Sequence, residues 1–311
     1  MDYAGYTYKF HVRRPPVHIK RLILLAACFM LAGTPFAIAG GDSDSLNLRY
    51  PIVLAHGWAG SDEYILGIDY FWGIKAELED EGADVLVADM SAFDTSDVRG
   101  AQLKTQILRY MAATGAAKVN IIGHSQGGVT SRYMISNLGM KSRVASLTMV
   151  SSPNRGTAVA DVVTGKLPNV LKWSLAALAN TFWGGLVAGD SNSRFLAATY
   201  ELTHYNMENV FNPNTPDMAG VRYLSYAGKM YAVSANVLLT PTWALIKYFD
   251  GDNDGVVPMS SAKWGTYKGD LKGLFGVDHF MEVNHLFGNT PGFDAKGFYV
   301  DMARSLEKYG L

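Results

Sequence analysis

Residues 119–127 read Val-Asn-Ile-Ile-Gly-His-Ser-Gln-Gly, and they constrain the fold of this chain more than any other stretch. An apolar run typical of a buried strand ends in Gly-x-Ser-x-Gly, and helix-compatible sequence follows from Gly128 to Leu138. A serine flanked by glycines can occupy a turn too sharp for neighbouring side chains, which lifts its hydroxyl into a pocket. The pentapeptide alone is common, but the order strand, Gly-x-Ser-x-Gly, helix predicts a nucleophile elbow at Ser125.

In the rest of the chain, apolar runs typical of strands alternate with helix-compatible stretches, as in an α/β fold. This alternation predicts a mostly parallel sheet flanked by helices, with right-handed crossovers and a site at the carboxyl ends of the strands. A helix over residues 302–308 is expected to cover one face of the sheet. The predicted strands are 52–55, 85–88, 119–122 and 145–150, and the predicted helices between them lie near 69–81, 98–113 and 128–138.

A serine nucleophile needs a general base, and three histidines follow Ser125 in the chain. His204 lies in a polar stretch of predicted helix and is expected to be solvated. His285 is expected to pack or to line a loop. His279 follows Gly-Val-Asp, as expected on a loop that leaves a strand, and is therefore the predicted base.

The base needs an orienting carboxylate, and in α/β-hydrolases the order along the chain is Ser, Asp or Glu, His. The candidates cluster in residues 250–258, after an apolar run at 243–249 that is interpreted as the preceding strand. Asp254 is the first choice and Asp252 the second. Asp278 is a third alternative, disfavoured because neighbours in sequence rarely face one another.

The tetrahedral intermediate that forms when a serine attacks a carbonyl needs backbone N–H donors directed at its oxyanion. The residue after the nucleophile, Gln126, is expected to supply one. Residues 50–58 read as an apolar strand ending in His-Gly-Trp, so the N–H of Trp58 is expected to supply the other. His56 is expected to pack.

Taken together, six stretches closely resemble the bacterial true lipases of the Pseudomonas and Proteus type. The resemblance covers most of the chain and is thin between residues 161 and 211. One departure is Asn154, where the family commonly has histidine. The stretches are 50–58, 66–74, 94–100, 119–127, 253–256 and 279–288.

The resemblance implies an α/β-hydrolase fold with an inserted helical lid. It makes Ser125 the nucleophile, Asp254 the acid and His279 the base, with Trp58 and Gln126 as oxyanion donors. The activity implied is triacylglycerol lipase, which hydrolyses long-chain acylglycerols at a lipid–water interface. A carboxylesterase or phospholipase with the same triad is the alternative. A hydrolase fold that serves only as a binding module is disfavoured, because every triad candidate and both elbow glycines are present.

The family usually carries a structural Ca²⁺ that ties the histidine loop to a neighbouring loop through two aspartates. The matching positions here are Thr240 and Met281. Calcium prefers anionic oxygen ligands, so the family site is predicted to be lost, with apolar packing around Met281 in its place. Residues 250–255 also mimic the start of an EF-hand loop, but the twelfth position is Ser261 instead of glutamate.

Residues 167–187 are apolar around most of a helical circumference. Trp173, Phe182 and Trp183 lie in this segment, and a polar stretch follows it. The segment is interpreted as a lid helix that covers the serine in water and turns its apolar face towards lipid. An ordinary buried helix is the alternative. The lid belongs to a predicted cap insertion over residues 158–215.

The N-terminus reads as an export signal over residues 1–39, which leaves a hydrolase domain over 40–311. Lys20 and Arg21 precede an apolar stretch, and Ala37-Ile38-Ala39 forms a small-x-small cleavage site, so secretion is expected. The stretch is too short to span a bilayer. An anchored lipoprotein modified at Cys28 is the alternative.

Cys28 is the only cysteine, so the exported chain forms no disulfide and depends on its core. Within the family, disulfide-free members resemble the Proteus type, so a dedicated folding chaperone is not expected. Removing residues 1–39 takes away five cations and one aspartate, which changes the net charge from −1 to about −5. No basic patch for nucleic acid remains.

Overall fold

The computed structural model describes residues 45–58, 69–165, 191–232, 236–285 and 288–311. The predicted signal, Cys28 and residues 167–187 of the predicted lid lie outside these residues. Among the described residues no helix is both long enough and apolar enough to cross a membrane.

The described domain is built on one six-stranded sheet in which every neighbouring pair is parallel. The strand order is β2-β1-β3-β4-β5-β6, so the chain crosses from one side of β1 to the other between β2 and β3. That reversal makes the carboxyl ends of β1 and β3 the switch point where α/β sheets bind ligands. The strands are β1 Ile52–Ala55, β2 Val85–Ala88, β3 Val119–His124, β4 Val144–Val150, β5 Arg222–Ala227 and β6 Thr266–Asp270.

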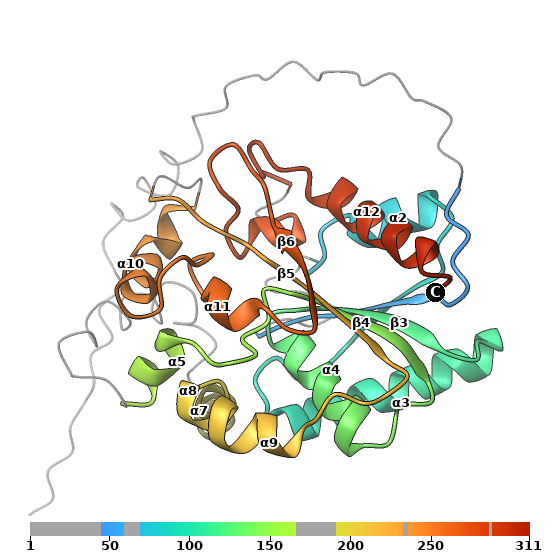
Figure 1. Cartoon of the computed structure of the whole chain (residues 1–311), viewed down its shortest axis with the longest axis horizontal. Coiled ribbons are helices and arrows are strands. Elements are labelled where there is room, and N and C mark those ends of the chain that lie inside the picture. Colours follow the sequence, from blue (N-terminus) through green and yellow to red (C-terminus); the bar gives the residue numbers. More distant parts are fainter. Residues whose placement is uncertain (1–44, 59–68, 166–190, 233–235, 286–287) are drawn as a thin grey trace, which may run out of the picture. The chain divides into compact units, whose positions relative to one another are not determined.

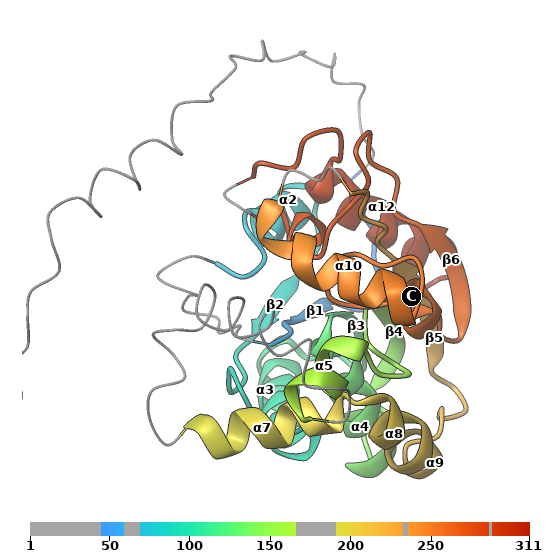
Figure 2. The same ribbon diagram turned by 90° about the vertical axis from the view of Figure 1, so that its left-hand side faces the viewer.

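Helices cover both faces of the sheet, with α12 and α2 on one side and α3 and α4 on the other (Figure 1). These four helices are α2 Ile74–Asp80, α3 Ser96–Thr114, α4 Gln126–Asn137 and α12 Ala295–Lys308. Figure 2 shows α5, α7, α8 and α10 in front of the strands, at one end of the sheet. The remaining helices are α5 Ala158–Val163, α7 Ser191–Glu201, α8 His204–Asn206, η2 Met207–Phe211, α9 Asn212–Asn214, η3 Val237–Leu239, α10 Thr240–Phe249, α11 Met259–Ala262 and η4 Met281–Val283.

The sequence of β1 explains why both sheet faces are covered. Successive side chains of a strand point to opposite faces. Ile52 and Leu54 pack in one apolar cluster with residues of α2 and α12, whereas Val53 and Ala55 pack in a second cluster with residues of α3 and α4. A run of apolar residues without polar alternation therefore belongs to a strand buried on both faces.

One predicted strand is wrong, because residues 243–249 belong to helix α10. Pro241 lies in the first turn, where its fixed φ suits a helix and no N–H is needed. Thr242, Leu245 and Ile246 are the buried residues of the helix, which is the i, i+3, i+4 spacing of a helical face. The acid loop therefore follows a helix, and the preceding strand of the sheet is β5.

The helix predicted over 69–81 begins later than expected, at Ile74. Gly73 precedes it with φ +68°, a left-handed conformation that residues with a Cβ rarely adopt. The segment from residue 69 to Gly73 is therefore a turn. Its residues Tyr70 and Phe71 are buried in the core cluster that also holds α2.

Candidate active site

Ser125 lies on a strained turn directly after β3. Its backbone has φ +55° and ψ −132°, outside the regions that ordinary residues occupy, and α4 begins at the next residue. The N–H of Ser125 donates to the carbonyl of Val150 at 3.0 Å, which holds the turn against β4. The sequence pattern strand, Gly-x-Ser-x-Gly, helix thus folds as an elbow, as predicted.

The packing around this turn leaves no room for side chains at its glycines. A Cβ on Gly127 would lie 2.1 Å from the carbonyl oxygen of Ala55 in β1. A Cβ on Gly123 would lie 2.6 Å from the backbone nitrogen of Gly128. Both neighbours are backbone atoms that cannot swing aside, so the glycines are required by close approach of the chain.

The structure joins the predicted acid to the predicted base. The Nδ1 atom of His279 lies 2.7 Å from Oδ2 of Asp254, and both side chains are buried. The other oxygen of Asp254 accepts the N–H groups of Val256 and Val257 at 2.8 and 2.7 Å. With Nδ1–H donating to Asp254, the Nε2 atom of His279 is left as a proton acceptor.

His279 lies beside the end of the nucleophile strand. Its ring centroid is 4.4 Å from that of His124, the residue before Ser125. Among the described residues no hydrogen bond joins the Ser125 hydroxyl to His279. Such contacts are often open in a ligand-free hydrolase and tighten when substrate binds.

The two predicted oxyanion residues lie at the switch point. Gln126 is the first residue of α4, and its side-chain amide donates to the carbonyl of Asp94 at 2.9 Å. Trp58 follows β1, and its indole stacks on Phe195 of α7 with ring centroids 4.9 Å apart. The intervening Gly57 lies against the elbow, since a Cβ there would be 2.5 Å from Cβ of Ser125. The backbone after β1 is therefore in contact with the serine turn.

A buried arginine that the sequence did not single out supports this loop. Arg99 of α3 is fully buried, and its Nη2 donates to the carbonyls of His56 and Gly57 at 2.7 and 3.2 Å. Burial lowers the pKa of Arg99 to about 10, so it stays charged at neutral pH. Together with burial, this charge lowers the pKa of His56 to about 3. His56 is neutral and packs, as expected.

The alternative acids have other contacts. Asp252 is partly exposed and pairs with Lys229 at 2.6 Å and with Lys247. Asp278 accepts the backbone N–H groups of Phe280 and Met281 at 3.0 and 3.1 Å, which caps the turn after His279. The hydrogen bond to the predicted base is made by Asp254, which supports the first choice of acid.

His204 is partly exposed, but its ring also has ion-pair partners that the sequence did not suggest. Its ring lies between Asp161, at 2.6 Å from Nδ1, and Asp250, at 3.5 Å from Nε2. These aspartates come from α5 and from the end of α10, so His204 links the region between β4 and β5 to the start of the acid loop. A single polar stretch of sequence could not reveal partners more than 40 residues away.

We expect the His204 contacts to make stability depend on pH. The hydrogen bond that the His204 ring donates to Asp161, together with the charges of Asp250 and Glu208, raises the pKa of His204 against its partial burial. Stabilisation by the charged ring is therefore complete below the ordinary histidine pKa near 6.5, and is lost as pH rises through the raised value. His204→Gln should lower the melting temperature by about 2–4 °C near pH 6 and by less near pH 9.

Thermal unfolding of the wild type and His204→Gln across this range measures the effect. Tyr205→Phe is the matched control, because Tyr205 is exposed and adjacent. A destabilisation of equal size at every pH would contradict the ionic origin of the effect.

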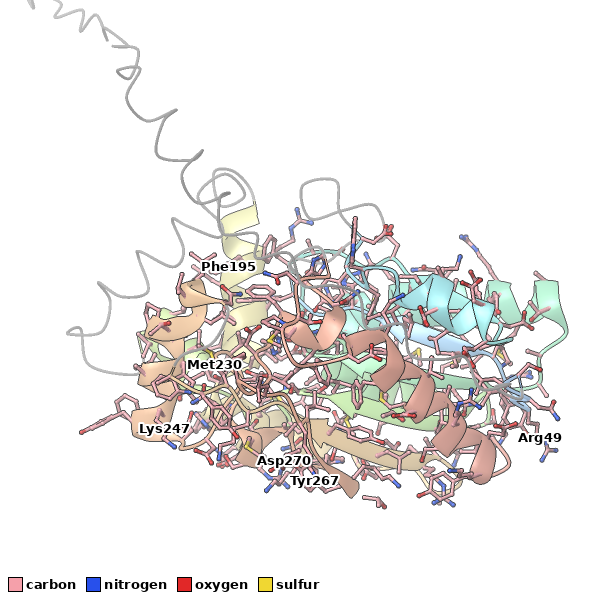
Figure 3. The ribbon with its side chains drawn as sticks, turned by 90° about the horizontal axis from the view of Figure 1, so that it is seen from above. Arg49, Phe195, Met230, Lys247, Tyr267 and Asp270 are labelled. Atoms are coloured by element: carbon pink, nitrogen blue, oxygen red, sulfur yellow. The ribbon has the colours of Figure 1, made fainter. Side chains whose placement is uncertain are left out.

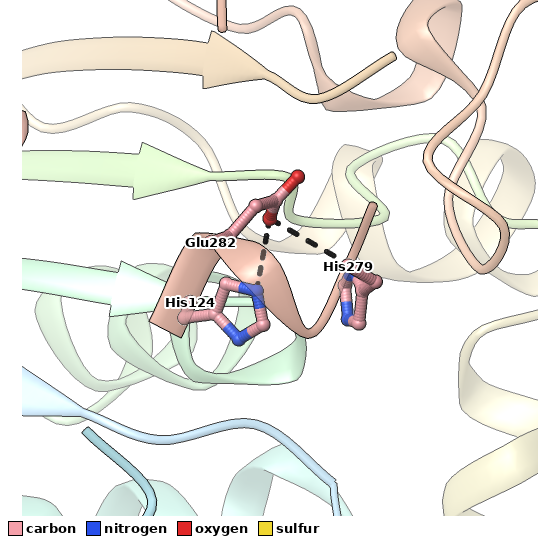
Figure 4. A group of neighbouring side chains, drawn as sticks. All are labelled: His124, His279 and Glu282. Atoms are coloured by element: carbon pink, nitrogen blue, oxygen red, sulfur yellow. Dashed lines mark hydrogen bonds and ion pairs between the residues drawn. The ribbon is translucent and has the colours of Figure 1, made fainter. Parts of the chain in front are cut away.

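A second buried carboxyl lies behind the acid–base pair, at Glu282 (Figure 4). Its Oε2 is 2.9 Å from Nε2 of His124 and 3.9 Å from Nδ1 of His279. Ligand atoms of the three side chains lie within 4.8 Å of one another, a spacing that would allow a metal ion. However, His124 and Glu282 are already hydrogen-bonded to each other, and Nδ1 of His279 is hydrogen-bonded to Asp254. The geometry therefore favours a hydrogen-bonded cluster over a metal site.

Figure 3 shows residues that lie at opposite ends of the molecule. Phe195, Met230 and Lys247 lie towards one end of the molecule, and Arg49, which precedes β1, lies at the other. Met230 donates its N–H to the carbonyl of Asn253, next to Asp254. The acid loop is thus held at the carboxyl end of the sheet, where the elbow also lies.

Comparison with known proteins agrees with this architecture. The family described as α/β hydrolase fold matches residues 50–180. A triacylglycerol lipase of Vibrio cholerae is 35% identical over 287 residues, covering 85% of this chain and 89% of that protein. A triacylglycerol lipase of Pseudomonas fragi is 33% identical over 303 residues, covering 86% and 99%.

The chain belongs to the bacterial triacylglycerol lipase family of the α/β-hydrolase superfamily. Solved structures agree in fold. A Bacillus licheniformis lipase in its mature form superposes with a TM-score of 0.62 at 21% identity, covering 88% of this chain and 96% of that chain. A metagenomic carboxyl esterase gives a TM-score of 0.64 at 17% identity, covering 89% and 82%.

The structure describes both residues at the positions where the family's calcium ligands were expected, Met281 and Thr240. Met281 is buried in an apolar cluster with Phe71, Ile74 and Val277, and it begins η4 after His279. Thr240 begins α10. Packing of Met281 thus contributes to holding the histidine turn in place.

Proposed function

We propose that this protein is a triacylglycerol lipase that hydrolyses ester bonds through an acyl-enzyme on Ser125. One observation carries the proposal: a buried Asp254–His279 pair lies beside the strand end that bears the strained serine. A hydroxyl held on such a turn has one chemical use that fits these neighbours, which is nucleophilic attack on a carbonyl.

In the proposed reaction, Nε2 of His279 accepts the proton of Ser125 as the hydroxyl attacks the ester carbonyl. Asp254 holds the ring through Nδ1–H and stabilises the imidazolium that forms. The backbone N–H groups of Trp58 and Gln126 stabilise the oxyanion. His279 then protonates the leaving alcohol, and water releases the fatty acid by the same steps.

Aromatic side chains beside the oxyanion loop support a long acyl substrate. Trp58 contacts Phe93 edge-on at 5.9 Å and stacks on Phe195 at 4.9 Å. Phe93 and Phe195 also contact each other at 5.6 Å. These rings form an apolar cluster next to the loop that contacts the serine turn, and apolar surroundings favour an acyl chain over a charged group. We extend the proposal to action at a lipid–water interface on the basis of the predicted lid.

The test compares emulsified triolein with soluble p-nitrophenyl butyrate as substrates. A lipase should hydrolyse triolein, and its rate should rise steeply once substrate exceeds its solubility. The assays are run in EDTA, because the predicted loss of the family's calcium site at Thr240 and Met281 implies that activity needs no Ca²⁺. Hydrolysis confined to short soluble esters would identify a carboxylesterase instead, and activity that EDTA abolishes would contradict the loss of the calcium site.

A further inference from the structure

Behind the proposed triad, four side chains form a continuous buried chain of hydrogen bonds, which we call the brace. The Tyr70 hydroxyl lies 2.7 Å from Nδ1 of His124, and Nε2 of His124 lies 2.9 Å from Glu282. Ser151 donates its hydroxyl to the other oxygen of Glu282 at 2.6 Å and accepts the N–H of Gly228 at 2.9 Å. All four side chains are buried.

The brace connects the segments that carry the proposed catalytic groups. His124 ends β3 directly before Ser125, Ser151 follows β4, and Gly228 follows β5. Glu282 lies in η4, three residues after His279. At its other end, a Cβ on Gly57 would lie 2.7 Å from the Tyr70 hydroxyl, so the brace reaches the oxyanion loop.

The hydrogen bonds distinguish the two buried carboxyl groups near His279. Asp254 accepts two backbone N–H groups and the ring N–H of His279. Glu282 accepts one hydrogen bond from the Ser151 hydroxyl, and within the described residues no lysine or arginine pairs with it. Two adjacent buried carboxylates would repel each other, so the group with fewer donors holds its proton.

The electrostatic surroundings agree with this assignment. Burial and the neighbouring charges of Asp254 and Asp278 raise the pKa of Glu282 well above its ordinary value. Burial and the rings of His279 and His285 lower the pKa of His124 well below its ordinary value. A protonated Glu282 then donates to Nε2 of a neutral His124, and Nδ1–H of His124 donates to the Tyr70 oxygen.

We propose that Glu282 is a neutral positioning residue, fixed by His124, Ser151 and Tyr70, that holds the His279 ring in register with the oxyanion loop. The inference rests on the proposed esterase chemistry. A neutral carboxyl 3.9 Å from Nδ1 of His279 leaves Asp254 as the anion that accepts the hydrogen bond of Nδ1–H. The brace therefore orients the base without adding a second charge to it.

Glu282→Gln and Glu282→Ala test the neutral state in the purified full chain with p-nitrophenyl butyrate. Glutamine keeps the acceptor for Ser151 and the donor for His124, so kcat should fall by less than about threefold, with the acid limb of the pH profile unmoved. Alanine removes both contacts, and kcat should fall by about 30-fold or more because the ring is misplaced. Equal losses in the two variants, or an acid limb displaced by about one pH unit in Glu282→Gln, would overturn the proposal.

Tyr70→Phe tests the far end of the brace with the loss of one oxygen atom. It leaves Nδ1 of buried His124 without its partner, so kcat should fall by about three- to tenfold with KM within about twofold. Tyr299→Phe is the matched control, because this tyrosine is in the same core cluster and its hydroxyl has no hydrogen-bond partner among the described residues. Equal kcat in Tyr70→Phe and Tyr299→Phe would show that the brace does not position the base.

Folding and function are separated by two further measurements. Circular dichroism and melting temperature show whether each variant folds. A wild type that hydrolyses no ester would refute the proposed function. An active wild type whose Glu282 variants do not show the expected losses of kcat would refute only the role of the brace.

Discussion

Ser125→Ala should lower kcat for ester hydrolysis by about 10⁶-fold, and His279→Ala should lower it about as far. In the proposed mechanism the serine hydroxyl supplies the electron pair that attacks the carbonyl, and the histidine acts as the base, so either loss removes the covalent route. The double variant should be no worse than either single variant, because the members of a triad act as a unit. Hydrolysis of triolein and p-nitrophenyl butyrate measures the effect.

Ser152→Ala is the matched control for the nucleophile. Ser152 is buried near the elbow, its hydroxyl has no hydrogen-bond partner in the described part of the chain, and a Cβ on Gly128 would lie 2.0 Å from its oxygen. Its loss should leave hydrolysis unchanged. If Ser125→Ala kept more than about one hundredth of the wild-type rate, another group would be the nucleophile.

Gly127→Ala should destabilise the fold by about 3 kcal/mol or more, because its Cβ would overlap the carbonyl of Ala55 in the central strand β1. For a chain of this size the melting temperature should fall by roughly 6–12 °C. Activity should fall with it, since the elbow must shift to relieve the overlap. Thermal unfolding followed by circular dichroism measures this loss.

Gly100→Ala provides the control for that experiment. Gly100 lies inside α3, and a Cβ there would meet its nearest neighbour at 3.4 Å, an ordinary contact. Alanine favours a helix over glycine by about 0.5–1 kcal/mol, so this variant should be as stable as the wild type or more stable. Equal melting temperatures for the Gly100 and Gly127 variants would show that the elbow does not depend on close approach.

Much of the sheet could be predicted because its signals are local. The predicted strands 52–55 and 85–88 have the observed bounds, and those at 119–122 and 145–150 extend by one or two residues. Each is an apolar run between polar breaks, which is what a strand buried on both faces requires. The run at 243–249 was wrongly predicted as a strand, because a short apolar run also suits a helix with one buried face.

The sequence by itself determined the elbow at Ser125, since only glycines fit where backbone approaches backbone, and it selected Asp254 and His279 from a short set of candidates. Only the tertiary structure decided the surroundings of Glu282, Arg99 and His204. Glu282 bonds to His124 and Arg99 to His56, at strand ends that come together when the sheet forms, and His204 bonds to Asp161 in α5. These three partners lie 43 to 158 residues away along the chain. The geometry of a turn is determined by residues that are adjacent in the sequence. The protonation and orientation of a buried group depend instead on neighbours that come close only when the chain folds.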